Sequence, residues 1–365
     1  MQQPVTLANW RSAPFNRWAF QHVRELIPTA DIPHEPRRVR EFKAEPRSFE
    51  LEGFLAETDT DGMVILHRGR LIAEHYANGM TPYSPHILLS VSKSMMGLLF
   101  GQLGIDPQRA VADVVPEVAG TAYKDATIRH LLDMRAGVAF EENYLATSGT
   151  IVEYRKATGW NALGPGDVPG DLHSFCKVLT ERDGPHGGRF HYISTNSDLL
   201  GWVIERATGR RYADLMSELI WQRIGAERSA YITVDRLGAP RCAGGMCVTV
   251  RDLARVGQWM LEQPSAWITD IERNGDRSAW DAGSFTAYFP GMPMRYRSQW
   301  YVLEANKGET AAPLIFGVGI HGQNLFIDRA NELVIAKLSS QAMPLDAARI
   351  GLTMRAVSQL RKNLS

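Results

Sequence analysis

The sequence predicts an α+β fold in which a discontinuous sheet domain carries an inserted helical subdomain. Strand-like runs of apolar and β-branched residues stand near both ends of the chain, and helical patterns separated by Gly/Pro loops fill the middle. Strands grouped apart from helices are typical of α+β proteins. We therefore predict an N-terminal extension over 1–44, a sheet subdomain formed by 45–104 and 226–365, and a helical subdomain over 105–225.

The composition is that of an ordinary globular protein. The chain has 365 residues, of which 44% are hydrophobic and 22% are charged, and 40 basic residues balance 40 acidic ones. This length can bury a large core, and the balanced charge offers no field that attracts nucleic acid or an anionic membrane. Three cysteines are too few for a disulfide framework, and we find neither a signal-peptide core nor a membrane-spanning run. We therefore expect a cytoplasmic protein without nucleic-acid or membrane partners.

The N-terminal half begins with a helix predicted over 15–27 and then a hairpin. Residues 63–67 and 71–76 are rich in β-formers and flank the turn-forming stretch Arg68-Gly69-Arg70. Residues 87–103 are apolar almost all round, which is typical of a buried central helix. Further helices are predicted over 127–134, 170–179, 197–207 and 212–224, with Gly209 placed to end the third of them.

The C-terminal part returns to strands after one more helix. Thr249 to Asp252 has the pattern of a capping box, and it opens a helix that we expect to reach Leu261. An amphipathic helix is predicted over 347–360 at the end of the chain. The strands are predicted over 297–303, 314–320, 323–327 and 333–338.

The glycines Gly317, Gly319 and Gly322 have the spacing of a dinucleotide-binding loop. Such a loop needs a following helix, whose N-terminal N–H groups hold the pyrophosphate. Here two apolar, β-branched runs follow, separated by a polar turn at 329–331. That pattern predicts a hairpin, so we reject a nucleotide site and look for another reason to place small residues on a strand.

The first candidate for catalysis is the pair Ser90 and Lys93, near the start of the apolar helix. Residues three apart share one helix face, so the hydroxyl and the amine can meet. A lysine takes a proton from serine only if its pKa is lowered, and apolar surroundings lower it by desolvation. The helix N-terminus adds N–H groups where an oxyanion would form. The alternative is a buried helix that tolerates both polar residues.

Two further observations bear on this pair. Ser174 and Lys177 repeat the spacing, but in an amphipathic stretch where Lys177 is expected to face water, so we treat the repeat as a chance match. Tyr192 stands just before a cluster of cap-type residues that opens a helix. A tyrosine that shares its proton with a buried lysine can relay protons to and from a serine. The alternative is a core tyrosine whose hydroxyl is satisfied by the backbone.

In this order, Ser90-x-x-Lys93, Tyr192-x-Ser194 and a glycine-containing strand near the C-terminus resemble the serine β-lactamase and penicillin-binding-protein superfamily. Within it, the chain is most similar to 6-aminohexanoate-dimer hydrolases (nylon-oligomer hydrolases) and to class C-like carboxylesterases. The resemblance covers roughly residues 50–360. It implies a β-lactamase/transpeptidase-like fold, an antiparallel sheet flanked by N- and C-terminal helices with an inserted helical subdomain.

The resemblance also implies roles for these residues. Ser90 would be the acylated nucleophile, Lys93 its proton acceptor, and Tyr192 the group that passes the proton to the leaving group, with Ser194 beside them. The implied activity is hydrolysis of carboxylic esters or small linear amides of the 6-aminohexanoate-oligomer type. Two alternatives stay open: a β-lactamase or D-amino-acid peptidase, and a catalytically silent acyl-binding protein of the same fold.

The third motif departs from the superfamily pattern. Its first residue is often Lys, His or Trp followed by glycine, whereas Gly317-Val-Gly319 begins with glycine here. Aligned in this way, Gly319 would let substrate lie close to the strand, and the N–H of Ile320 would complete the oxyanion hole with that of Ser90. An alternative register places His321 in the motif. The missing strand lysine disfavours recognition of a substrate carboxylate at that position, and with it β-lactam hydrolysis.

The remaining polar and aromatic residues give weaker indications. His186 and His191 have no nearby partners to complete a metal set, so we expect neither a metal nor an organic cofactor. The expected partner is a small-molecule ester or amide; a homodimer is compatible with the sequence, which does not fix the oligomeric state. Aromatic residues that could line an apolar cleft, each equally compatible with packing, are Tyr144, Tyr154, Trp160 and Trp300.

Overall fold

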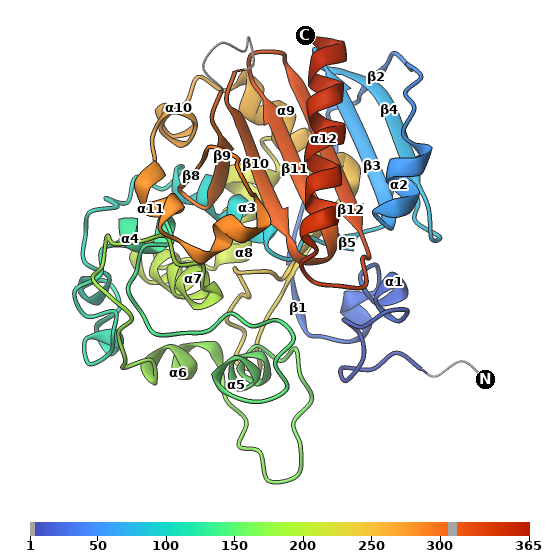
Figure 1. Ribbon diagram of the computed structural model, residues 1–365. Helices are drawn as coiled ribbons and strands as arrows, with labels where there is room; N and C mark the ends of the chain where they lie inside the picture. The colour runs from blue at the N-terminus through green and yellow to red at the C-terminus, as the bar shows by residue number, and fades with distance from the viewer. Residues whose placement is uncertain (1–3, 306–311) are drawn as a thin grey trace.

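The computed structural model describes residues 4–305 and 312–365 (Figure 1). In this part of the chain an eight-stranded sheet forms the centre of the molecule, and all neighbouring strands in it are antiparallel except β2 and β4. The α+β class and the antiparallel sheet are thus confirmed. The strands in spatial order are β2 (Lys43–Ala44), β4 (Arg70–Tyr76), β3 (Thr60–His67), β12 (Leu333–Ser339), β11 (Gln323–Asp328), β10 (Leu314–Gly319), β9 (Trp300–Leu303) and β8 (Met294–Arg297).

Helices cover both faces of this sheet, which explains why its central strands are buried along their whole length. Successive residues of a strand point to opposite faces. Accordingly, Val64 of β3 packs in the core that contains α9 (Val250–Glu262) and α3 (Val91–Phe100), whereas Ile65 packs in the core that contains α12 (Ala347–Leu364). Figure 1 shows α12 lying across one face with α2 (Glu52–Glu57) beside it. The sheet is therefore a rigid support for α3 on its other face.

A second, four-stranded sheet joins the N-terminal segment to the rest of the molecule. Its order is β1 (Thr29–Ile32), β6 (Ala230–Thr233), β7 (Met246–Val248) and β5 (His86–Ile87). Trp10 and Phe20 are fully buried in a core shared with Trp160, with the rings of Trp10 and Trp160 5.2 Å apart edge to face. The segment that we expected to be an extension is thus integrated through both pairing and packing.

The helices expected in the middle of the chain are present, with Gly209 in the left-handed conformation (φ 66°) at the end of α7. Within residues 4–305 and 312–365, no helix is both long enough and apolar enough to cross a membrane. The further α-helices are α1 (Asn16–Ala19), α4 (Ile128–Leu132), α5 (Thr150–Ala157), α6 (Leu172–Lys177), α7 (Ser194–Thr208), α8 (Tyr212–Met216), α10 (Ala266–Arg273) and α11 (Arg277–Asp281). The short helical turns are η1 (Val23–Glu25), η2 (Pro36–Arg38), η3 (Val111–Asp113), η4 (Pro116–Val118), η5 (Ser217–Trp221), η6 (Ser284–Tyr288) and η7 (Ile320–Gly322).

Three predicted elements differ from the structure. The helix expected over 15–27 is divided into α1 and η1, and the helix expected from 87 begins only at Val91, because 86–87 form strand β5. The strand expected over 297–303 is a hairpin of β8 and β9, whose turn residues Ser298 and Gln299 both have positive φ. Neither is glycine, so composition gave no signal for the turn.

The glycine-rich stretch forms a hairpin, as predicted. Strand β10 passes through η7 directly into β11, which pairs antiparallel with β10 on one side and β12 on the other. A strand stands where a dinucleotide-binding loop requires a helix.

Candidate active site

Ser90 lies in the short turn between β5 and α3. It caps the N-terminus of α3, and the preceding residue, Leu89, has a left-handed backbone with φ of 45°. A non-glycine residue in this region costs roughly 1–3 kcal/mol and persists only where its surroundings hold it. Here the Leu88 N–H donates to the Met246 carbonyl at 2.8 Å, and Leu88 and Leu89 are buried. The held turn places Ser90 at the wall of a small hollow of about 30 Å³.

Lys93 lies one turn further along α3 and is 1% exposed. Its Nζ is 3.0 Å from Ser90 Oγ and 3.1 Å from Ser194 Oγ, and it donates to the Ala243 carbonyl at 2.7 Å. Burial lowers the pKa of Lys93 to about 7, although the negative charge of Glu142 acts in the opposite direction. An amine with this pKa is partly unprotonated near neutral pH, and its lone pair can then accept the Ser90 proton.

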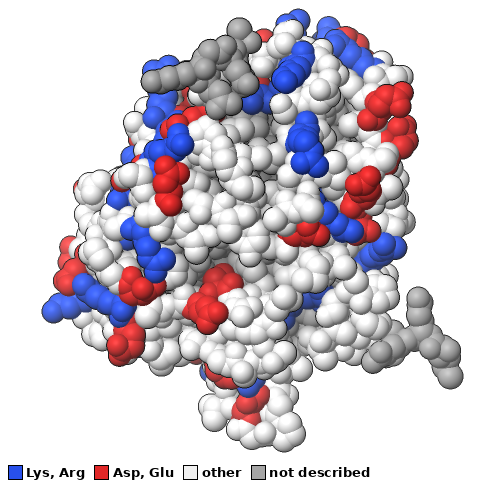
Figure 2. Space-filling view, in the orientation of Figure 1, with Lys and Arg blue, Asp and Glu red and all other residues white. Residues whose placement is uncertain are grey.

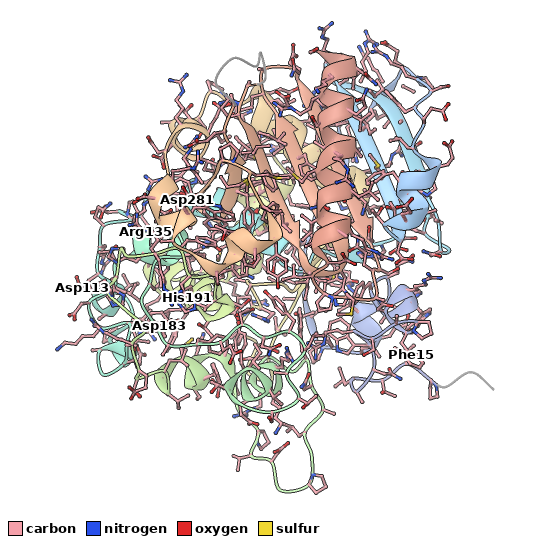
Figure 3. The ribbon with its side chains drawn as sticks, in the orientation of Figure 1. Phe15, Asp113, Arg135, Asp183, His191 and Asp281 are labelled. Carbon is pink, nitrogen blue, oxygen red and sulfur yellow. The ribbon has the colours of Figure 1, made fainter. Side chains whose placement is uncertain are left out.

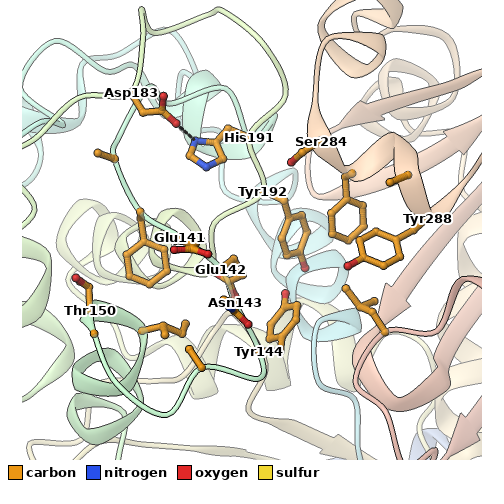
Figure 4. A pocket seen from close by; sticks show the side chains of 18 of the residues that line it. Glu141, Glu142, Asn143, Tyr144, Thr150, Asp183, His191, Tyr192, Ser284 and Tyr288 are labelled. Carbon is orange, nitrogen blue, oxygen red and sulfur yellow. Dashed lines mark ion pairs between the residues drawn. The ribbon is translucent and has the colours of Figure 1, made fainter.

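Tyr192 lies directly before α7 and is 7% exposed. The Lys93 Nζ is 4.9 Å from the centre of its ring. Burial raises the pKa of Tyr192 above its ordinary value, and interaction with the Ser90 side chain opposes the rise. Figure 4 shows the hydroxyl ends of Tyr192, Tyr144 and Tyr288 directed toward one another across the pocket. The fold thus brings together serine, lysine and tyrosine from two distant stretches of sequence.

Glu142 is a polar residue of the site that sequence reasoning missed. Its carboxylate accepts hydrogen bonds from Ser194 Oγ at 2.6 Å and from the Ser194 N–H at 2.8 Å. Ser194 is in turn the neighbour of Lys93, so Glu142 fixes one wall of the lysine site and supplies a nearby negative charge. Glu142 follows no motif spacing, and only the folded chain brings it to α7.

Two backbone N–H groups are candidate donors for an oxyanion hole. Ser90 and Ile320 line the same small hollow. Among the turn, loop and cap hydrogen bonds of residues 4–305 and 312–365, neither the Ser90 N–H nor the Ile320 N–H donates to a backbone carbonyl. Unpaired N–H groups beside a nucleophile are the donors that an oxyanion needs. The placement of Ile320 agrees with the first of the two registers considered for the third motif.

The glycines of β10 serve a different purpose from the expected one. A Cβ on Gly317 would lie 2.9 Å from Ser94 Oγ, and a Cβ on Gly319 would lie 2.6 Å from the Leu88 carbonyl oxygen. The side of each glycine that lacks a Cβ therefore faces α3 or the turn before it, instead of an approaching substrate. Glycine is needed because the strand packs directly against the backbone that carries Ser90.

His321 does not line the small hollow of Ser90, although it borders the next hollow together with Ile320. It is 3% exposed, its Nδ1 is 2.6 Å from the Gln341 carbonyl, and its ring packs edge to face on Phe20. Burial lowers the pKa of His321 to about 4. A neutral histidine bound to the backbone in this way acts as a structural link between η7 and the segment after β12, so the register that places His321 in the third motif loses support.

The predicted aromatic residues divide into three groups. Tyr144 borders the small hollow and both of the larger hollows beside it. Tyr154 and Trp160 line the small hollow, but their polar atoms are bound to Asp198 and to Thr233. Trp300 is fully buried in the main core and lines none of these hollows, so its expected place in the cleft is wrong.

Two large hollows of unlike charge adjoin the small one. One, of about 790 Å³, contains Tyr192 together with Glu141, Glu142 and Asp183, and His191 Nδ1 lies 3.7 Å from Asp183 (Figure 4). Asp183 and His191 stand on the helical side of the molecule, across from the N-terminal segment that carries Phe15 (Figure 3). The other hollow, of about 690 Å³, is bordered by that N-terminal segment and carries arginines. Elsewhere, acidic and basic residues are interspersed over the visible face (Figure 2).

The histidines and cysteines of the described residues do not gather into a metal site. In the described part of the chain, no group of three or more His, Cys, Asp or Glu side chains is arranged to hold a metal ion. The thiols of Cys176, Cys242 and Cys247 are free and buried, and burial raises the pKa of each. Thiols of this kind are unreactive.

Comparison with known proteins identifies the fold and its family. Residues 50–357 match the β-lactamase family. The chain is 37% identical to the 6-aminohexanoate-dimer hydrolase of Paenarthrobacter ureafaciens over 361 residues, which cover 93% of this chain and 89% of that protein.

Two solved structures have the same fold as this chain. A Bacillus anthracis protein described as a 6-aminohexanoate-dimer hydrolase superposes with a TM-score of 0.87 at 24% identity, covering 100% of this chain and 98% of that one. EstCE1, a hydrolase with promiscuous acyltransferase activity, superposes with a TM-score of 0.64 at 16% identity, covering 84% and 96%. The expectation of an α+β serine hydrolase of this superfamily is thereby confirmed, and the chain belongs to the β-lactamase family.

Proposed function

We propose that this protein hydrolyses carboxylic esters or small linear amides through an acyl-enzyme on Ser90. The observation that carries the proposal is the buried Lys93 amine, 3.0 Å from Ser90 Oγ and with its pKa lowered to about 7. A serine becomes a nucleophile only when a base takes its proton. Lys93 is a base that is available near neutral pH, and it is built into the same helix.

The reaction follows from the placement of the groups. Lys93 accepts the Ser90 proton as Oγ attacks the carbonyl carbon, and the N–H groups of Ser90 and Ile320 bind the resulting oxyanion. Tyr192, in contact with the lysine, delivers a proton to the departing alcohol or amine and takes back the proton that Lys93 accepted from Ser90. Water then attacks the acyl-enzyme, with the same groups acting in reverse, and releases the acid. Ser194 and Glu142 hold Lys93 in place throughout.

The substrate class rests on the relatives as well as the site. The Paenarthrobacter relative is named for 6-aminohexanoate dimer, a linear amide, and its match spans most of both chains. The third motif begins with Gly317 instead of a strand lysine, which disfavours β-lactams and D-amino-acid peptides. A panel of p-nitrophenyl esters, the linear 6-aminohexanoate dimer and a chromogenic cephalosporin separates these classes. Turnover of the cephalosporin alone would refute the proposal.

A catalytically silent acyl-binding protein is the remaining alternative. Such a protein would form a stoichiometric acyl adduct without turnover. The preserved contacts among Ser90, Lys93 and Tyr192 argue against it, because deacylation uses the same groups as acylation. Steady-state release of p-nitrophenol beyond one equivalent would exclude it.

The pH dependence of the reaction should report the protonation state of Lys93. Its proton must be absent for Ser90 to be activated, and the pKa of Lys93 is lowered to about 7 by burial. We therefore expect kcat/KM for a p-nitrophenyl ester to rise with pH and level off above about 7, falling about tenfold per pH unit below it. Initial rates between pH 5.5 and 8.5 measure this, with circular dichroism at each pH as the folding control. A flat profile in folded protein would contradict the role of Lys93.

Tyr192 should matter more for amides than for esters. An amine must be protonated as the tetrahedral intermediate collapses, whereas a phenolate leaves without assistance. Tyr192→Phe is therefore expected to lose at least about tenfold more activity on a linear amide than on the activated ester of the same acid. The two kcat/KM ratios give the answer. Equal losses on both substrates would restrict Tyr192 to the activation of Ser90.

A further inference from the structure

Three guanidinium groups surround the small hollow that Ser90 lines. Arg11 comes from the N-terminal segment, Arg155 from α5 and Arg241 from the loop after β6, and all three line the hollow together with Ser90 and Ile320. Guanidinium groups repel one another, so such a cluster persists only where partners or a ligand neutralise it.

Of these arginines, Arg241 pairs with a carboxylate, whereas Arg155 is held by backbone carbonyls and by the more distant charge of Glu142. Arg241 forms a buried ion pair with Asp198. Arg155 donates to the backbone carbonyls of Asn143 and Ala146 at 3.0 Å each, and the negative charge of Glu142 acts on it.

Arg11 has no carboxylate partner of this kind. It donates to the side-chain oxygen of Asn161, an uncharged amide. Among residues 4–305 and 312–365, no Asp or Glu lies within ion-pair distance of Arg11. Burial and repulsion by Arg155 and Arg241 lower the pKa of Arg11 to about 9. Arg11 is therefore a cation without an ion-pair partner among the described residues, and it lies at the wall of the hollow that Ser90 and Glu142 also line.

The position of Arg11 indicates which part of a substrate it faces. Arg11, Arg155 and Asn161 also line the hollow of about 690 Å³, which reaches Ile320. Tyr192 borders the opposite hollow of about 790 Å³, which carries Glu141 and Asp183. With the leaving group on the side of Tyr192, which gives it a proton, the hollow lined by Arg11 remains for the acyl chain.

We propose that Arg11, assisted by Arg155, binds a carboxylate at the far end of the substrate's acyl chain. The inference rests on the proposed function, because it assumes an acyl-enzyme on Ser90. Preferred substrates would be monoesters or monoamides of linear dicarboxylic acids. The 6-aminohexanoate dimer, whose acyl half ends in an ammonium group, would be cleaved less efficiently than these. The cation that is missing from the third motif at Gly317 would be supplied instead by the N-terminal segment.

The proposal is tested with three p-nitrophenyl esters of six-carbon acids that differ only in their end group: the adipate monoester, the hexanoate and the 6-aminohexanoate. The native enzyme should prefer the anionic ester over the neutral one and the neutral one over the cationic one. Arg11→Gln should reduce the ratio of kcat/KM for adipate over hexanoate about ten- to a hundredfold, mainly through KM, as for loss of a charged hydrogen bond. Arg11→Lys should restore part of the ratio.

Arg17→Gln is the matched control. Arg17 belongs to the same N-terminal segment, but its side chain is 53% exposed and pairs with Asp59. This variant should keep the native ratio. Melting curves confirm that each variant is folded.

The outcomes separate the inference from the function on which it rests. An unchanged adipate-to-hexanoate ratio in folded Arg11→Gln would overturn the inference and leave the hydrolase intact. The substrate N-hexanoyl-6-aminohexanoate carries its carboxylate on the leaving group. If Arg11→Gln lowers kcat/KM for this substrate alone, the assignment of Arg11 to the acyl side would be overturned.

If native enzyme cleaves none of the substrates, the proposed function fails, and calorimetry then tests Arg11 on its own. Adipate should bind more tightly than hexanoate to native protein and lose that advantage in Arg11→Gln. Equal binding of both acids would overturn the anion site as well.

Discussion

Ser90→Ala should abolish hydrolysis of every substrate that the native enzyme cleaves, with a loss of roughly 10⁴- to 10⁶-fold in kcat. The hydroxyl, 3.0 Å from the Lys93 amine, is the atom that would carry the acyl group. Ser194 Oγ lies 3.1 Å from the same amine, but it donates its hydrogen to Glu142. Ser90 caps α3 without a side-chain hydrogen bond to the helix, so its replacement leaves the cap unchanged. Loss of turnover would therefore report chemistry and not folding.

Ser174→Ala is the matched control for this variant. Ser174 has the same spacing to Lys177, yet its hydroxyl donates to Asp171 at 2.9 Å and Lys177 is exposed. Activity should stay close to the native value. A fluorophosphonate probe should label a peptide that contains Ser90, and the label should disappear in Ser90→Ala. Inactivity of Ser174→Ala, or labelling at another residue, would show that the nucleophile is elsewhere.

The pairing of Ser90 with Lys93 could be predicted from sequence because its geometry is largely local. Ser90 and Lys93 meet because α3 repeats every 3.6 residues, and an all-apolar helix indicates that the lysine is buried. This relation depends on a few consecutive residues, and the structure keeps it. Tyr192 stands just before α7, but its place beside Lys93 joins distant stretches of sequence and was implied only by the family resemblance.

The rest of the site depends on contacts between distant segments. Glu142 reaches Ser194, and Arg11 reaches Asn161, from 52 and 150 residues away. Neither belongs to a spacing that a single sequence can reveal. The error in the expected position of Trp300 has a related cause. Its strand begins after a turn of two non-glycine residues with positive φ, which the composition did not indicate, and the Trp300 ring packs in the main core.

The glycines of β10 illustrate how a correct observation can have a different cause. Small residues on this strand were expected to make room for substrate. The structure uses them to bring the strand against α3, with Gly319 opposite the Leu88 carbonyl. Since Leu88 stands two residues before Ser90 and Gly319 directly precedes Ile320, this one contact sets the separation of the two candidate oxyanion donors.

Gly319→Val is accordingly expected to damage catalysis severely. A Cβ at this position would lie 2.6 Å from a backbone oxygen that has no freedom to rotate away, so strand and turn must separate. The Ile320 N–H then moves from its place beside Ser90. Loss of one oxyanion donor costs about a hundred- to a thousandfold in rate, and we expect a loss of that size in kcat. Gly319→Ala, with the same Cβ and less bulk, should fall between Gly319→Val and the native enzyme.

Two controls separate this effect from general damage. Gly53→Ala adds a methyl group where no atom lies within 4 Å, so it should leave kcat unchanged. His321→Asn tests the other register of the third motif and keeps a residue that tolerates the φ of 60° at this position. Because His321 binds Gln341 away from Ser90, the substitution should lower the melting temperature more than kcat. A folded Gly319→Val enzyme with near-native turnover, together with an inactive His321→Asn, would place the histidine and not Ile320 at the oxyanion.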